Sequence, residues 1–235
     1  MKLVIEKLEK SYDDKKVLWG IDFTFEHGKI YGLLGRNGAG KTTLFNCLNE
    51  DIEFDSGEFY LSTDNDKKIV DVDDIGYVLS TPIVPEFLTA REFLKFFIEI
   101  NKGKTETKRS IDELFDLVKI DKEDRDKLLR EYSHGMKNKM QLLVNIVYNP
   151  KILLLDEPLT SFDVVVAEEM KKLLKTIKKD KIIIFSTHIM ELALDLCDEI
   201  VILNNGKLQL MDKNNLNNKE LKEKILLSLK GDENA

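Results

Sequence analysis

The feature that most constrains this chain is a short glycine-rich segment between two regular patterns. Residues 35–42 have the sequence Gly-Arg-Asn-Gly-Ala-Gly-Lys-Thr, follow the apolar run Ile30–Leu34 and precede Leu44, Phe45 and Leu48 at helical spacing. An apolar run that leads through glycines into a helical pattern predicts a strand, a loop and a helix. The loop amides and the helix N-terminus then point at one place, which favours an anion such as phosphate.

The spacing Gly-x4-Gly-Lys-Thr is typical of phosphate-binding loops. In such a loop Lys41 supplies positive charge between the β- and γ-phosphates of a nucleotide, and the Thr42 hydroxyl ligates Mg²⁺. A glycine-rich turn with an exposed lysine is the alternative interpretation. The predicted nucleotide-binding residues of this segment are Gly35, Arg36, Asn37, Gly38, Ala39, Gly40, Lys41, Thr42 and Thr43.

Two acids at the end of a second apolar run complete the pattern. Asp156 and Glu157 follow Ile152–Leu155 and precede Pro158. Because alternate strand residues face opposite ways, both carboxylates serve one site only if the strand ends there, and Pro158 favours such an end. We expect Asp156 to hold Mg²⁺ and Glu157 to orient and deprotonate a water molecule.

Composition excludes several classes of protein. The 235 residues are 43% apolar and 34% charged, which is enough for one sizeable globular domain. A net charge of -7 argues against binding of nucleic acid through bulk charge. No run approaches the 18 or more apolar residues of a membrane helix, and early acidic residues argue against a signal peptide, which predicts a soluble, cytosolic subunit. Cys47 and Cys197 lie in apolar segments and are expected to be buried free thiols.

Patterning divides the chain into three zones. Residues 1–82 and 146–212 contain short apolar runs and are predicted to form the nucleotide-binding core with a β subdomain. Two of these runs, Ile152–Leu155 and Ile182–Phe185, flank a helical pattern, which predicts a parallel sheet buried on both faces. Residues 83–145 are predicted to be helical, and residues 213–235 a C-terminal helix and tail whose Leu221, Ile225 and Leu229 pack inward.

The helical zone carries two further signals. Thr89, with Glu92 three residues later, predicts a capping box at a helix start. The apolar residues Phe87, Phe93, Phe96, Phe97 and Ile100 follow at helical spacing.

Several segments together resemble the nucleotide-binding subunit of an ATP-binding cassette (ABC) transporter, over roughly residues 1–210. Tyr132-Ser133-His134-Gly135-Met136 resembles the family signature Leu-Ser-Gly-Gly-Gln, in the variant frequent in bacterial exporters of drugs, peptides and bacteriocins. The resemblance implies an α/β fold: a three-layer P-loop NTPase core with a mainly parallel sheet, an N-terminal antiparallel β subdomain and an inserted α-helical subdomain. It also implies an ATPase that uses ATP and Mg²⁺.

The resemblance assigns roles to single residues. Tyr12 stands where the family stacks an aromatic ring on adenine, and His188 where a histidine hydrogen-bonds the γ-phosphate; without the resemblance both are ordinary residues. Ser133 and Gly135 are expected to contact the γ-phosphate bound by the opposite subunit, although Ser133 alone is a routine helix cap. Asp163, at the end of Thr160-Ser161-Phe162-Asp163, is expected to make contacts across the dimer.

One position departs from the family pattern. Ser80 stands where the family has a glutamine that contacts Mg²⁺ and the attacking water. A serine hydroxyl is able to bind a metal-bound water, but it is shorter, so unusual coupling to the membrane partner is expected. The predicted metal-binding residues are Thr42, Asp156 and Ser80, and the predicted catalytic residues are Glu157, His188 and Lys41.

The resemblance therefore predicts an ATPase subunit that forms a homodimer or a heterodimer around two ATP molecules and drives a separate membrane permease from the cytoplasmic face of the membrane. Export of a peptide or drug-like amphipathic substrate is expected. Ile83, Val84 and Phe87 are candidates for the groove that receives the permease, with core packing as the alternative explanation. The alternative functions are a soluble ABC-type ATPase without a transport role, another P-loop enzyme such as a GTPase, and an immunity or regulatory subunit with weak hydrolysis.

Overall fold

The computed structural model describes residues 1–63, 66–105, 107–159, 162–211 and 218–230. Thr160 and Ser161 of the predicted cross-dimer segment lie outside the described residues, as do 212–217 and 231–235 of the predicted tail. The division of the chain at residues 82/83, 145/146 and 212/213 stays a prediction.

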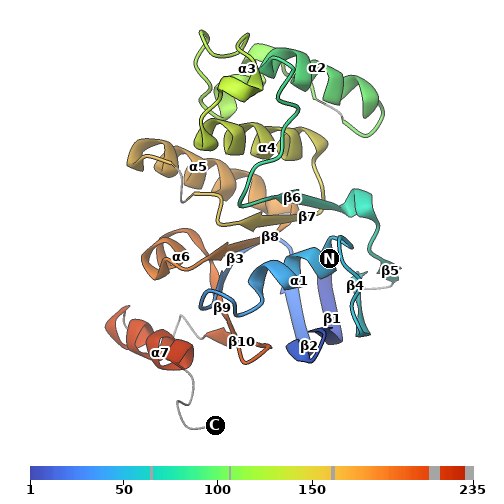
Figure 1. Ribbon diagram of the computed structural model, residues 1–235, viewed down its shortest axis with the longest axis vertical. Coiled ribbons are helices and arrows are strands. Elements are labelled where there is room, and N and C mark those ends of the chain that lie inside the picture. Colours follow the sequence, from blue (N-terminus) through green and yellow to red (C-terminus); the bar gives the residue numbers. More distant parts are fainter. Residues whose placement is uncertain (64–65, 106, 160–161, 212–217, 231–235) are drawn as a thin grey trace.

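A six-stranded sheet forms the centre of the molecule (Figure 1). Its order is β10-β9-β3-β8-β7-β6, and every neighbouring pair is parallel except β9 and β10, which the Asn204-Asn205-Gly206 turn joins. All residues of β7 and β8 are buried, as their unbroken apolar runs predict. The strands are β3 (Lys29–Leu34), β6 (Ile75–Val78), β7 (Ile152–Asp156), β8 (Ile182–Thr187), β9 (Glu199–Asn204) and β10 (Lys207–Met211).

A second sheet of four antiparallel strands lies beside the first, in the order β2-β1-β4-β5. It is built from the N-terminal part of the chain, and Asp13 with a positive φ turns β1 into β2. The strands are β1 (Lys2–Tyr12), β2 (Lys15–Glu26), β4 (Ser56–Ser62) and β5 (Lys67–Ile69).

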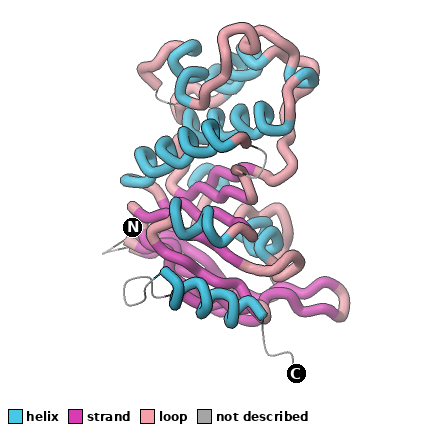
Figure 2. The backbone as a smooth tube through the Cα atoms, turned by 90° about the vertical axis from the view of Figure 1, so that its left-hand side faces the viewer, coloured by secondary structure: helices cyan, strands magenta, loops and turns pink. Residues whose placement is uncertain are grey.

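Helices cover both faces of the central sheet. Alternate residues along β3, β7 and β8 belong to two buried clusters: one includes α1 and the antiparallel sheet, the other α4, α5, α6 and α7. Figures 1 and 2 show α2, α3 and α4 at the end of the molecule next to β6. The helices are α1 (Lys41–Leu48), α2 (Ala90–Ile100), α3 (Ile111–Leu117), α4 (His134–Tyr148), α5 (Val164–Ile177), α6 (Met190–Leu196) and α7 (Asn218–Lys230), with 3-10 turns at Val72–Asp74, Leu129–Glu131 and Lys178–Asp180.

Local predictions for the helices are confirmed. Thr89 caps α2 in a capping box with Glu92, and Ser133 caps α4 by accepting the Met136 N–H. Leu221 and Ile225 of α7 are fully buried in the core. Both cysteines are buried, as predicted.

Core packing, the alternative explanation for Ile83, Val84 and Phe87, holds only for Val84, which packs against the core. Ile83 and Phe87 are 74% and 78% exposed, and Phe96 and Ile100 of α2 are also more than half exposed. The helix buries Leu94 and partly buries Phe93 and Phe97, so its apolar side is wider than the core that it meets. Helical spacing alone does not distinguish an apolar residue that packs in the core from one that is exposed on the surface.

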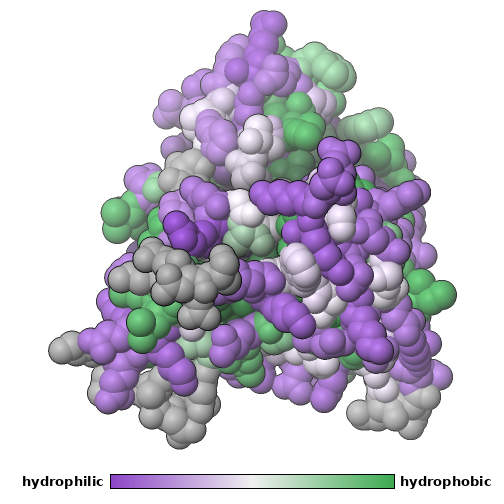
Figure 3. All heavy atoms as spheres, turned by 60° about the horizontal axis from the view of Figure 1, so that its bottom comes forward, coloured by the Kyte–Doolittle hydropathy of each residue, from purple (hydrophilic) through white to green (hydrophobic). Residues whose placement is uncertain are grey.

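On the face seen in Figure 3 hydrophilic side chains predominate, and hydrophobic ones gather in separate groups. None of the helices in the described part of the chain is both long and apolar enough to cross a bilayer.

We expect Gly76→Ala to destabilise the fold by about 1–3 kcal/mol, because a Cβ at Gly76 of β6 meets Asn145 Oδ1 of α4 at 2.2 Å and Pro150 Cγ at 2.7 Å. Urea denaturation measures the loss. Adding Asn145→Ala removes the closer obstacle, so the double variant should recover part of the stability; a double variant less stable than either single one contradicts this explanation.

Candidate functional site

The glycine-rich loop runs from the end of β3 at Leu34 to the start of α1 at Lys41. Gly38 and Gly40 have φ values of +81° and +104°, and a Cβ at Gly40 would meet Val17 Cγ1 at 2.8 Å, so the turn requires glycine there. The first turn of α1 has no acidic residue, and Gly40 caps it without a side chain. The helix N-terminus therefore keeps amides and partial positive charge for an anion.

The Asp156 carboxylate at the end of β7 joins two other segments of the chain. Thr42 Oγ1 donates to Asp156 Oδ2 at 2.8 Å, and Ser186 Oγ of β8 donates to Asp156 Oδ1. Asp156 is 3% exposed. Because a buried carboxylate is stable only with such partners, these bonds fix Asp156 against the start of α1.

Glu157 leaves the strand. Its φ is +50°, and its N–H donates to Ser186 O and Ser186 Oγ, both at 3.2 Å. The left-handed conformation turns the Glu157 side chain to the same side as that of Asp156, where an extended strand would separate them. Glu157 Oε2 lies 2.8 Å from His188 Nδ1, so the predicted base and the predicted γ-phosphate ligand contact each other.

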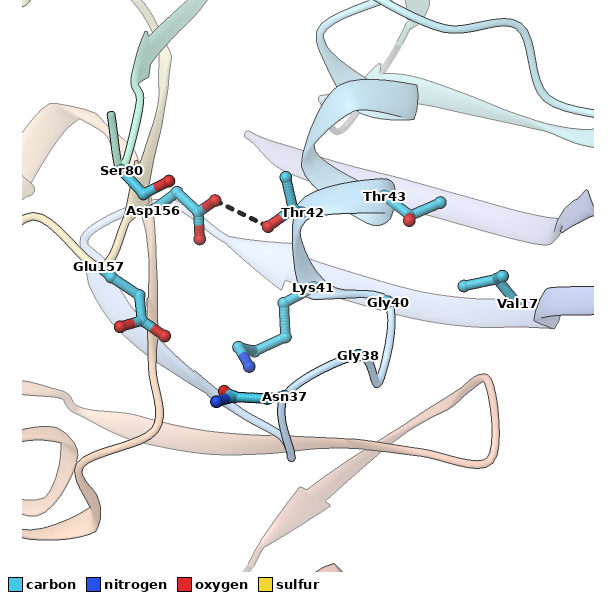
Figure 4. A pocket seen from close by; sticks show the side chains of 10 residues that line it. All are labelled: Val17, Asn37, Gly38, Gly40, Lys41, Thr42, Thr43, Ser80, Asp156 and Glu157. Carbon is cyan, nitrogen blue, oxygen red and sulfur yellow. Dashed lines mark hydrogen bonds between the residues drawn. The ribbon is translucent and has the colours of Figure 1, made fainter. Parts of the chain in front are cut away.

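The glycine-rich loop, Asp156 and Glu157 line one cavity of about 330 Å³ (Figure 4), whereas His188 and Ser186 are not among its lining residues. The loop and α1 form one side, Ser80, Asp156 and Glu157 form the other, and the Lys41 side chain extends between them. Residues that the sequence predicted from separate segments therefore lie around the same cavity. The lining residues are Val17, Asn37, Gly38, Gly40, Lys41, Thr42, Thr43, Ser80, Asp156 and Glu157.

Lys41 is held by the loop itself. Its Nζ donates to Gly35 O at 2.9 Å and to Arg36 O at 3.3 Å. Burial lowers the pKa of the Lys41 ammonium, and the Glu157 and Asp156 carboxylates oppose that shift. The ammonium is thus placed close to the carboxylates, in a cavity able to admit phosphate oxygens.

The oxygen atoms of this site fit a magnesium ion. Mg²⁺ prefers oxygen ligands at about 2.1 Å in an octahedron, which places neighbouring ligands about 3 Å apart. Thr42 Oγ1 and Asp156 Oδ2 are 2.8 Å apart, a spacing that suits two such ligands. Among the described residues no three His, Cys, Asp or Glu side chains form a metal cluster, so phosphates and waters would supply the remaining ligands.

Other predicted residues lie outside the cavity lining. Tyr12 is exposed at the end of β1, with Lys10 Nζ 5.1 Å from its ring centroid. Ser133 and Gly135 begin α4, and Asp163 caps α5 by accepting the Val165 and Val166 N–H groups at 3.0 Å. Arg36 and Ala39 bond to each other within the loop, Ala39 N donating to Arg36 O.

Sequence reasoning missed Val17 and Ser186. Val17 lies on β2, far from the loop in sequence, and contacts it only because the two sheets pack together. Ser186 binds Asp156 because β8 pairs with β7 at that residue. A polar residue at the end of a buried run, two positions before His188, was the available signal.

Comparison with known proteins agrees with this arrangement. The family model described as "ABC transporter" matches residues 18–160. An uncharacterized ABC transporter ATP-binding protein of Methanocaldococcus jannaschii is 38% identical over 208 residues, covering 88% of this chain and 75% of that protein. The bacitracin transport ATP-binding protein BcrA of Bacillus licheniformis is 34% identical, covering 86% and 66%. The Fe(3+) ions import ATP-binding protein FbpC of Fusobacterium nucleatum is 31% identical, covering 87% and 56%.

A solved structure, described as the ATP-binding subunit of an ABC transporter, has the same fold. Its TM-score is 0.81 at 24% identity, and the match covers 96% of this chain and 100% of that one. The chain belongs to the ABC transporter family, as its ATP-binding ATPase domain. The predicted α/β fold, with a mainly parallel sheet and an N-terminal antiparallel sheet, is confirmed.

We expect Lys41→Ala to weaken ATP binding at least about a hundredfold, because the ammonium in the loop is removed. Titration calorimetry with ATP measures the affinity. Lys172→Ala, at an exposed lysine of α5, is the matched control and should bind like the wild type. An unchanged affinity in Lys41→Ala would remove the loop from the binding site.

Proposed function

We propose that this chain is the ATP-hydrolysing subunit of a transporter, in which two cassettes enclose two ATP molecules and drive a separate membrane subunit. The observation that carries the proposal is the cavity in which the loop around Lys41 faces Asp156 and Glu157. A triphosphate in this cavity has amides and Lys41 on one side and carboxylates on the other.

The roles of the cavity residues follow from their chemistry. Lys41 and the loop amides bind phosphate oxygens, and Thr42 and Asp156 would hold Mg²⁺, which would supply positive charge against that of the phosphates. Glu157 accepts the proton of the water that attacks the γ-phosphorus, and the leaving group is ADP. His188, 2.8 Å from Glu157, orients that carboxylate and hydrogen-bonds the γ-phosphate.

A second ATPase subunit, identical or closely related, completes each site. Ser133 and Gly135 lie at an exposed helix start that has no acidic residue in its first turn. Such a helix start favours an anion, and in this proposal the anion is the γ-phosphate bound by the other subunit. Asp163 lies at the start of α5 and belongs to the same interface. Loss of the γ-phosphate after hydrolysis then opens the dimer.

The membrane subunit docks on an apolar groove beside α2. The groove has a volume of about 620 Å³ and is lined by Pro85, Phe87, Leu88, Glu92, Phe93 and Phe96. Exposed aromatic side chains of this kind favour a protein partner. The partner is a cytoplasmic segment of the permease, which places this chain at the cytoplasmic face of the membrane.

Export is the direction that we propose, with a peptide or drug-like amphipathic substrate. The segment Tyr132-Ser133-His134-Gly135-Met136 and the 34% identity with the bacitracin transport protein support it. The iron import protein at 31% identity is the competing relative, so direction is the part of the proposal that transport measurements must decide.

Glu157→Gln tests the catalytic assignment. We expect the variant to bind ATP normally, to hydrolyse it about a hundredfold or more slowly, and to form a dimer that survives gel filtration with ATP. Glu53→Gln, at an exposed glutamate, should hydrolyse at the wild-type rate. Full turnover in Glu157→Gln would refute the role of this residue as general base.

Phe87→Asp tests the docking groove. Because Phe87 is 78% exposed, we expect the isolated variant to fold and to hydrolyse ATP, but to lose co-purification with the membrane subunit of the proposed transporter. Val72→Asp changes another exposed apolar residue, in the 3-10 turn before β6 and outside the groove lining, and serves as the control. Equal loss of the membrane subunit in both variants would contradict a specific groove.

A further inference from the structure

Gln141 and Asn145, two amides one turn apart in α4, face β6 and the segment that follows it. Gln141 is 6% exposed. Its Oε1 accepts the Leu79 N–H at 3.0 Å, and its Nε2 donates to Ile83 O at 3.4 Å. Asn145 Nδ2 donates to Gln141 O at 2.9 Å and to Tyr77 O at 3.4 Å.

The segment held by Gln141 lies between the two functional surfaces of the chain. Leu79 is followed by Ser80, which lines the nucleotide cavity beside Asp156. Ile83 is followed by Val84 and by Pro85, which lines the apolar groove. One side chain therefore binds the backbone at both ends of the five-residue connection 79–83.

A buried amide in this place has a cost that only bonding offsets. Gln141 lies between Met140 and Leu142, both buried in the apolar core, and an unbonded amide there would give up its hydrogen bonds to water without replacement. Its two bonds to backbone groups offset that cost and also fix the distance from α4 to the segment. An apolar side chain of similar length would fill the space without fixing the segment.

We propose that Gln141 is a positioning residue for the ATPase reaction, which holds the Ser80 hydroxyl at the nucleotide cavity by binding Leu79 and Ile83. Because Ser133 caps α4, Gln141 also ties the segment to the helix that the proposed dimer contacts. This inference rests on the proposed function. The Ser80 hydroxyl is too short to reach far into the cavity, so its effect depends on where its backbone is held.

A double-variant cycle in the full chain tests the inference. Gln141→Met keeps the length of the side chain and removes both hydrogen bonds. We expect Gln141→Met and Ser80→Ala each to lower kcat roughly fivefold with KM nearly unchanged, and the double variant to be no slower than the slower single one, because both changes remove one effect. Gln209→Met makes the same change at the chain's other glutamine, exposed on β10, and should leave kcat unchanged.

A binding measurement gives a readout that does not depend on turnover. In the Glu157→Gln background with ATP, the affinity for Mn²⁺ is measured by electron paramagnetic resonance. We expect Ser80→Ala and Gln141→Met to weaken it by similar factors that do not multiply in the double variant. A general loss of stability would instead lower both kcat and the Mn²⁺ affinity, with or without Glu157→Gln. It would also appear as a lower midpoint in urea denaturation.

Three outcomes overturn the inference: losses that multiply in the double variant, a Ser80→Ala variant with wild-type kcat and Mn²⁺ affinity, or a Gln141→Met variant indistinguishable from Gln209→Met. If Gln141→Met does not fold, the same cycle uses Gln141→Glu, which keeps the acceptor for Leu79 and loses the donor to Ile83. Failure of the proposed function is distinct, because the wild type would then not hydrolyse MgATP or Lys41→Ala would bind ATP normally.

Discussion

The bonds of Thr42 and Ser186 to the Asp156 carboxylate hold three separate parts of the chain together. Thr42 belongs to the helix after β3, Ser186 to the end of β8, and Asp156 to the end of β7. The carboxylate is buried, so each bond is worth more than it would be in water. In our proposal Thr42 and Asp156 would together hold Mg²⁺, and the bond from Ser186 would keep the Asp156 carboxylate in position.

This meeting of residues depends on the order of strands. Because β8 lies between β3 and β7 and all three are parallel, their carboxyl ends form one edge. Residues at and after the ends of β3, β7 and β8 therefore come together although they are distant in sequence; Thr42 and Asp156 lie 114 positions apart. Glu157 joins them only because its backbone leaves the strand in a left-handed conformation. The bonds from its N–H to Ser186 compensate for that unfavourable conformation.

The sequence predicted those parts of the molecule in which local pattern and chemistry agree. The strand, loop and helix around Lys41 follow from spacing, and the buried strands β7 and β8 follow from unbroken apolar runs. Contacts that depend on how distant segments pack against each other were not predicted from the sequence. Val17 meets the loop only through the packing of two sheets, and Gln141 meets Leu79 only because α4 crosses β6. For Phe87 and Ile83 the sequence allowed either core packing or a docking groove, because apolar spacing alone does not tell whether a side chain is exposed.

The start of α5 offers a physical reason for the proposed pairing of two chains. Val164 and Val165, directly after Asp163, are 80% and 70% exposed. Valine is a poor residue for the first turn of an exposed helix, and burying each side chain would gain roughly 1.5 kcal/mol or more. An interface that covers this helix start and the start of α4 would bury the valines and place Ser133 opposite a bound phosphate. The same surface would then supply both the free energy of association and the Ser133 contact to the phosphate. Association of the two subunits would therefore depend on whether the γ-phosphate is bound.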